Sequence, residues 1–179
     1  MNRNTDIECS EIIKEGFGLS TGMQLYDPFI RSVSDNFALM ANMKVDILGA
    51  FCSETEEFMS YGVSSIINYT GKIRGRFLLD MEPGVALSIT QNVMGVYYDN
   101  VKDSMVLAAI SEMNNIISGN AVSVLNNAYS LGLWLSPPYI FTGKNALIAL
   151  PKIQSASVEC NTLYGKLKVN VAFERGETK

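Results

Sequence analysis

The clearest pattern in the chain is a long run, Lys102 to about Asn127, in which apolar residues recur every three or four positions. Because an α-helix advances about 100° per residue, this spacing gathers the apolar residues into one stripe, made of Val106, Ile110, Met113, Ile117, Ala121 and Val124. The pattern predicts a long helix that buries this stripe. The face nearly opposite would then carry Ala108, Glu112, Asn115, Gly119 and Asn126 and would remain free.

Two shorter helices are predicted earlier in the chain. Asp27 and Pro28 are typical of a helix start, with Asp27 as N-cap, and the helix would run to about Asn42. Its apolar stripe would be Phe29, Val33, Phe37 and Met40. A second helix would begin at Pro83 and end by Gly95.

Short runs that suit a pleated surface predict the strands, at Lys44–Phe51, Ser64–Thr70, Ile73–Asp80, Gly132–Ser136, Ala146–Leu150, Ser155–Asn161 and Lys166–Glu174. The first three are read as an antiparallel meander and the last two as a hairpin. Strand pairs with short turns, interleaved with three helices, indicate an α+β fold in which a mainly antiparallel sheet carries its helices on one side. Residues 1–25 have weak periodicity and predict an N-terminal extension, followed by a single domain over 26–179.

Composition narrows the function. A net charge of −4 without any run of Lys or Arg argues against nucleic-acid binding. The most apolar stretch, Met105 to Leu125, is interrupted by polar residues and is not expected to cross a membrane. Three widely separated cysteines suggest neither a disulfide framework nor a zinc site. We therefore expect a soluble, cytoplasmic protein with no nucleic-acid or membrane partner.

The chain contains no histidine, which excludes a Ser-His-Asp triad, an imidazole metal cluster and a phosphohistidine relay. It also has no glycine-rich phosphate loop. Any catalysis must therefore rest on carboxylate, amide or hydroxyl groups, and the free face of the long helix offers the first two in Glu112 and Asn115. A glycine within a helix, such as Gly119 on that face, lowers helix stability by about 0.8–1.0 kcal/mol relative to alanine. Either a kink in the helix or the close approach of another molecule would explain a glycine at this position.

Several motifs together resemble the CheC, CheX and FliY family of chemotaxis phosphatases. The motif of that family begins with Asp or Ser; Glu follows after three intervening residues, Asn after two more, and Pro after a further twenty-two. Glu112, Asn115 and Pro138 match this pattern. Further likeness lies in Asp27-Pro28-Phe29-Ile30, Ser118-Gly119-Asn120-Ala121 and Thr142-Gly143-Lys144, and it extends over roughly 27–175. The chain has one Glu-x-x-Asn where CheC proteins have two motif copies, which favours CheX. The first motif position is Ala108, and Ser111 lies nearby in a different register.

The resemblance implies a phosphatase that hydrolyses the aspartyl phosphate of a CheY-like response regulator. Asn115 would orient the attacking water, Glu112 would pair with the regulator's active-site lysine, and Ser111, Gly119 and Ala108 would contact the partner. The chain would hold no metal or cofactor of its own, whereas Mg²⁺ would lie in the receiver domain.

The resemblance also implies a homodimer formed by joining sheet edges, for which Lys166–Glu174 is a suitable strand. Two other functions remain open. Ala108 favours a non-catalytic module that binds a phosphorylated receiver or a flagellar-switch component. An unrelated small-molecule enzyme would need a pocket of convergent polar groups that the sequence does not reveal.

Overall fold

The computed structural model describes residues 25–54, 57–151 and 153–174. The helices are α2 (Asp27–Ala41), α3 (Pro83–Met94) and α4 (Ser104–Tyr129). The strands are β1 (Asp46–Glu54), β2 (Glu57–Met59), β3 (Val63–Thr70), β4 (Arg74–Met81), β5 (Trp134–Leu135), β6 (Tyr139–Thr142), β7 (Leu147–Ala149), β8 (Gln154–Thr162) and β9 (Gly165–Glu174).

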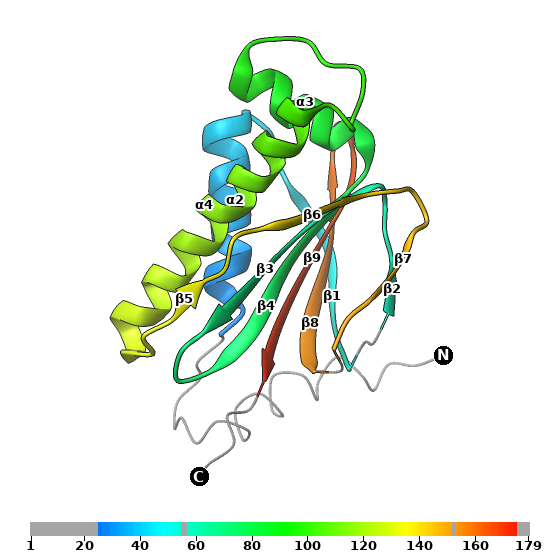
Figure 1. The fold of residues 1–179 in the computed structure, drawn as a ribbon. Coiled ribbons are helices and arrows are strands. Elements are labelled where there is room, and N and C mark those ends of the chain that lie inside the picture. The colour runs from blue at the N-terminus through cyan, green and yellow to red at the C-terminus, as the bar shows by residue number, and fades with distance from the viewer. Residues whose placement is uncertain (1–24, 55–56, 152, 175–179) are drawn as a thin grey trace.

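The main sheet runs in the order β1-β8-β9-β4-β3-β5, with β6 also paired to β3, and every pairing is antiparallel. The two central hairpins, β3–β4 and β8–β9, meet where β4 pairs with β9. Figure 1 shows α2, α3 and α4 grouped on one face of this sheet. The predicted α+β class, with three helices on one side in the described part of the chain, is therefore confirmed.

The core lies between the helices and the sheet. Strand residues alternate in direction, so β4 sends Phe77, Leu79 and Met81 toward the helices. At its centre Phe29 of α2 stacks on Phe77 and Tyr69, with ring centroids 5.1 and 5.6 Å apart. Such aromatic contacts add to the free energy gained by burying large side chains, and they fix α2 against the middle of the sheet.

The opposite face of the sheet has its own cover. Among the described strands, β2 and β7 pair only with each other and form a separate two-stranded ribbon. Figure 1 shows this ribbon standing apart from the helices, beside β1 and β8. As a result, side chains such as Leu78 and Asn170, which point away from the helices, are also buried.

Two predictions about strand order are wrong. β1 does not continue a meander into β3; it pairs with β8 at the far edge of the sheet. β9, expected as an edge strand over Lys166–Glu174, is paired on both sides, with β8 and β4. The cause is the same in both cases: the pairing partners are distant in sequence, and local pattern specifies a strand but not its neighbours.

Two strands and a helix cap also differ from expectation. β6 follows directly after Pro137 and Pro138 and lies outside the predicted strands, and β2 is too short to give a periodic signal. The N-cap of α2 is Tyr26 rather than Asp27, which instead lies in the first helical turn with Pro28. An acidic residue there still complements the positive end of the helix dipole.

Candidate functional site

Helix α4 is a continuous rod that carries the predicted site. At its start, the Asp103 side chain accepts a hydrogen bond of 2.8 Å from the backbone N–H of Met105, as an N-cap does. At its end, Ser130 adopts the left-handed conformation that closes many helices. The 26 residues between them include Gly119 without any break, so this glycine is a regular member of the helix.

The helix buries the predicted apolar stripe with one exception, and it exposes the centre of the predicted free face. Val106, Ile110, Met113, Ile117 and Ala121 are in the core, whereas Ala108, Glu112 and Asn115 are exposed. Ser111 and Gly119 are half-buried. Val124, predicted in the buried stripe, is 54% exposed because it faces an open groove of about 550 Å³ between α2 and α4. Leu125 takes its place in the core.

Asn126 has a structural partner. Its side-chain amide donates to the carbonyl of Leu133 at 3.1 Å and accepts from the N–H of the same residue at 2.7 Å. This pair of bonds holds the chain that leaves α4 against its last turns. Of the polar residues predicted on the free face, Glu112 and Asn115 therefore stand out as a carboxylate and an amide one helical turn apart.

A buried polar contact lies directly behind the exposed pair. Asn114 is fully buried; its amide donates to the Ser65 hydroxyl of β3 at 2.8 Å and accepts from Ser118 at 3.3 Å. A directional bond from helix to sheet restricts rotation of the helix about its own axis. Since Asn115 follows Asn114, the same bond determines which way Asn115 and Glu112 point.

Helix α2 holds α4 from the side. The Ser32 hydroxyl donates to the backbone carbonyl of Ile117 at 2.9 Å, and the Asn36 amide donates to the Ser32 hydroxyl at 3.0 Å. Asn120 reaches Asn36 at 3.4 Å. The sequence analysis predicts neither these contacts nor the bond between Asn114 and Ser65. The available signal was that polar residues 114 and 118 are spaced one turn apart beside the apolar stripe.

We expect Asn114→Ala to lower the free energy of unfolding by about 2 kcal/mol, because it leaves the buried Ser65 hydroxyl without its partner. Asn115→Ala, at the exposed neighbouring position, should change it by less than about 0.5 kcal/mol. Urea denaturation of the two variants measures this difference. Equal stabilities would contradict the assignment of Asn114 as the residue that anchors α4.

No metal or membrane feature accompanies this face in the parts of the chain that the structure describes. Those residues contain no group of three His, Cys, Asp or Glu side chains that could hold a metal ion. None of their helices is both long and apolar enough to cross a membrane. Cys160, the described free cysteine, is buried on β8, and burial raises the pKa of its thiol to about 11.

The antiparallel sheet with helices on one face, and a long helix exposing a Glu and an Asn one turn apart, define a CheC/CheX-like domain. The family model described as chemotaxis phosphatase CheX matches residues 63–168, more than half of the chain. The chain therefore belongs to the CheX family. The match spans β3 through the start of β9 and includes all of α4.

Solved structures share this fold. CheX from Desulfovibrio desulfuricans is 18% identical with a TM-score of 0.76, and the alignment covers 85% of this chain and 100% of that one. CheX from Vibrio vulnificus is 21% identical, with the same coverage and TM-score. CheX from Borrelia burgdorferi, solved in complex with CheY, BeF₃ and Mg²⁺, is 24% identical with a TM-score of 0.73, covering 86% and 99%. No curated protein matches significantly.

Proposed function

We propose that this chain dephosphorylates the aspartyl phosphate of a CheY-like response regulator in chemotaxis or two-component signalling. The observation that carries the proposal is the exposure of Glu112 and Asn115 on one face of α4 in a chain of the CheX family. The side chains of Glu112 and Asn115 project from a helix that hydrogen bonds hold against the sheet on its buried side. Such a helix can insert both side chains into the active site of a partner protein. The substrate is then a protein, and the chemistry takes place at the partner's acyl phosphate.

Asn115 has the role of orienting the attacking water. Phosphoryl transfer proceeds through a loose transition state, so catalysis depends mainly on placing the nucleophile in line with the leaving oxygen. A carboxamide can hold water through both its oxygen and its N–H groups. It is uncharged, so it adds no repulsion beside the phosphoryl oxygens. This role needs no general base, in keeping with a chain that lacks histidine.

Glu112 has the role of docking. A carboxylate placed beside a phosphoryl group would be repelled, but it can pair with the lysine of the receiver's active site. The receiver supplies the Mg²⁺ that neutralises charge on the phosphoryl oxygens, and this chain needs no cofactor of its own. The Borrelia burgdorferi relative, solved with CheY, BeF₃ and Mg²⁺, supports a partner of this kind.

Ala108, Ser111 and Gly119 complete the proposed contact surface around this pair. Ala108 is exposed one turn before Glu112 and Gly119 is half-exposed one turn after Asn115. The first motif position therefore presents a methyl group where the family pattern has Asp or Ser. We expect this change to remove a polar contact to the receiver and to leave water positioning by Asn115 in place.

Decay of a phosphorylated CheY-like receiver, measured with and without an equal amount of this chain, tests the proposal. Faster decay supports it, and an unchanged rate rejects it. The second candidate, a non-catalytic module for a phosphorylated receiver or a flagellar-switch component, is favoured by Ala108. It predicts the opposite result, because a binder without water positioning slows the receiver's own decay or leaves it unchanged.

Gly119 provides a separate test of the docking face. A Cβ atom built on this residue meets no atom of the chain within 4 Å, so internal packing does not require a glycine here. We expect Gly119→Ala to stabilise the fold by about 0.8–1 kcal/mol, through higher helix propensity. We expect it also to weaken receiver binding, because the methyl group separates the two surfaces.

Thermal unfolding and titration with a receiver activated by BeF₃ and Mg²⁺ measure the two effects of Gly119→Ala. Asn127→Ala is the matched control, since Asn127 is exposed on the same helix outside the proposed face and also gains helix propensity. It should keep wild-type affinity. A stabilised Gly119→Ala protein that binds the receiver as well as wild type would remove Gly119 from the contact surface.

We further propose a two-fold homodimer that leaves both α4 faces open, and a cytoplasmic location. Among the described strands, β1 has a single neighbour, β8, so its other edge is available for pairing. Ile47 and Leu48 on this strand are both more than half exposed, which favours burial against a second copy.

The division into an extension over 1–25 and a domain over 26–179 also stays a proposal, because residues 1–24 lie outside the described residues.

Light scattering at micromolar concentration tests the dimer. We expect twice the chain mass of 19.7 kDa for wild type and a monomer for Leu48→Lys, which places a charge in the proposed interface. The same change at exposed Leu163, in the β8–β9 turn, is the control and should remain dimeric. A wild-type monomer would remove the dimer.

A further inference from the structure

The exposed face of α4 forms a stripe that differs from one end to the other. Along it, the residues follow one another at intervals of three or four positions and therefore lie in one line on the helix; they are Met105, Ala108, Glu112, Asn115 and Gly119. The carboxylate and the amide are in the middle of this line, in Glu112 and Asn115. Neither end of the line carries a charged side chain, but the two ends differ in shape and in apolar surface.

The N-terminal end of the stripe is apolar. Met105 is 45% exposed, and Ala108 is exposed one turn later. The backbone N–H of Met105 donates to the Asp103 side chain, which fixes the backbone at this point. The segment between α3 and α4 adds Val96 and Tyr97, which are more than half exposed, at the same end of the molecule (Figure 1). The start of α4 therefore leaves apolar surface in water that a partner can cover.

The C-terminal end of the stripe has a low profile. Gly119 has no side chain, and a Cβ atom built on it meets no atom of the chain within 4 Å. Ser123, which continues the line, donates its hydroxyl to the carbonyl of Gly119 at 2.7 Å and so turns it back onto its own helix. A partner therefore meets apolar side chains on one side of the Glu112–Asn115 pair and small groups on the other. This asymmetry defines a direction along α4.

Ala108 extends the apolar end to within one turn of Glu112. The CheX pattern has Asp or Ser at this position, whereas this chain presents a methyl group. With a rise of 1.5 Å per residue, Ala108 and Met105 lie about 6 and 10 Å from Glu112 along the helix axis. An apolar strip of this length is sufficient to receive one large apolar side chain.

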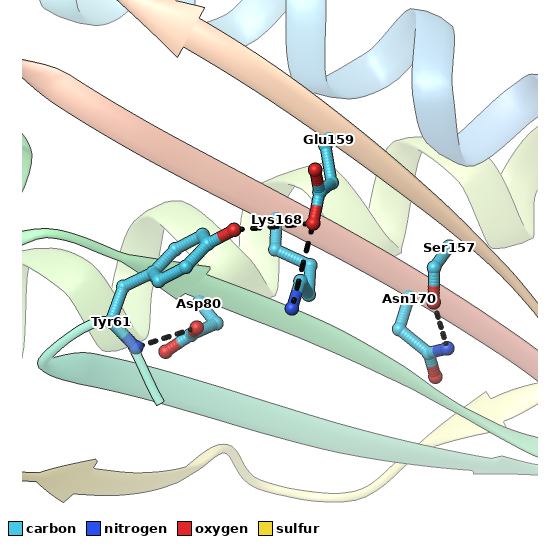
Figure 2. Close-up of polar contacts among 6 residues, drawn as sticks. All are labelled: Tyr61, Asp80, Ser157, Glu159, Lys168 and Asn170. Carbon is cyan, nitrogen blue, oxygen red and sulfur yellow. Dashed lines mark hydrogen bonds and ion pairs between the residues drawn. The ribbon is translucent and has the colours of Figure 1, made fainter. Parts of the chain in front are cut away.

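The far face of the sheet differs from this stripe, because polar side chains there engage one another. Lys168 lies 3.9 Å from Glu159, and the Tyr61 hydroxyl donates to the same carboxylate at 3.3 Å. Figure 2 shows these side chains gathered around Glu159. Met59, on the β2–β7 ribbon that covers this side, is 59% exposed. It is thus an exposed methionine comparable with Met105 but remote from α4.

We propose that Met105 and Ala108 form an apolar contact with the receiver, which selects receivers that carry an apolar side chain beside their active site. That side chain lies against Met105 and Ala108, toward the N-terminal end of α4, while Glu112 pairs with the receiver's lysine. The contact deepens the proposed function and rests on it, because both use the same docking face. It adds a determinant of specificity outside the reacting groups.

Titration of the full chain with a receiver activated by BeF₃ and Mg²⁺ tests this contact. We expect Met105→Gln to bind about fivefold more weakly than wild type does, because it replaces apolar surface by a polar group of similar length and helix propensity. Met105→Leu, which stays apolar, should bind within about twofold of wild type. Met59→Gln is the matched control and should bind as wild type does. Equal affinity of Met105→Gln and wild type would overturn the proposal.

Ala108→Asp distinguishes an apolar contact from a polar contact that is merely missing. We expect the receiver to bind this variant about tenfold more weakly, because the new carboxylate loses water against an apolar surface. Tighter binding or faster turnover would show that the receiver offers a polar group here, and would contradict the proposal. The loss of affinity in Met105→Gln should be the same at low and high salt, since an apolar contact is not screened.

Failure of this contact is distinguishable from failure of the proposed function. If wild type accelerates receiver decay while Met105→Gln and Ala108→Asp bind as wild type does, the apolar contact is removed and the proposed function stands. If wild type binds the receiver without accelerating its decay, the phosphatase function is rejected, and the affinities of the variants still decide the contact. Absence of receiver binding by wild type would reject both.

Discussion

Asn115→Ala is expected to reduce the acceleration of receiver dephosphorylation by about a hundredfold or more, to the receiver's own rate. The change removes the group that we propose to orient water. Misplacement of a nucleophile by about 1 Å lowers a reaction rate by about a hundredfold. Affinity for a receiver activated by BeF₃ and Mg²⁺ should change by less than about threefold, because the proposed role is confined to the reacting water. Measurement of decay rate and affinity on the same preparations separates the two.

Asn127→Ala is the control for this result, since it removes an exposed amide from the same helix. It should retain full activity. Asn115 is exposed and follows an anchored residue, so its loss should not disturb the fold. If Asn115→Ala turns over the receiver as fast as wild type does, the amide is not the water-positioning group.

Glu112→Lys is expected to have the largest effect on binding, with a loss of affinity of about a hundredfold and a parallel loss of turnover. The reversal replaces an attractive contact with the receiver's lysine by a repulsive one, and like charges brought together at an interface cost several kcal/mol. Glu112→Gln should bind the receiver about tenfold more weakly than wild type does, since it keeps the shape of the side chain and removes only its charge. Titration with the activated receiver at low and high salt measures both variants.

Salt dependence makes the Glu112 experiment specific. Wild-type affinity should fall as ionic strength rises, and Glu112→Gln should show a weaker fall, because a screened charge pair has been removed. Glu174→Lys, at an exposed end of β9, is the control for net charge and should behave as wild type does. Equal salt slopes for wild type and Glu112→Gln would show that this carboxylate does not pair with a receiver cation.

The sequence predicts which face of α4 is exposed more accurately than it predicts the order of the strands in the sheet. The exposed face of α4 follows from helical periodicity, a local property, and Glu112 and Asn115 lie on it as expected. The exception, Val124, is exposed by the gap between α2 and α4, which depends on how two helices meet. The start and end of α3 at Pro83 and Gly95 also follow from local signals.

What could not be predicted depends on contacts between distant segments. The partner of β1 is β8, about a hundred residues later in the chain, and no local pattern encodes that choice. The burial of Asn114 depends on Ser65 in β3, far away in the sequence. The buried side-chain atoms of Arg76 and Asn170 that have no hydrogen-bond partner also have no signature in the sequence, where both are ordinary polar residues in alternating strands.

The central claim, that the exposed face of α4 catalyses turnover of a phosphorylated receiver, is tested most directly at low catalyst concentration. Phosphorylated receiver in about tenfold excess over this chain is followed until the phosphoryl group is lost. Our account predicts that all of the receiver is dephosphorylated faster than it decays alone, because each chain acts repeatedly, and that Asn115→Ala lacks this effect. Decay at the receiver's own rate, or protection of one receiver per chain, would contradict it and would identify a binding module instead.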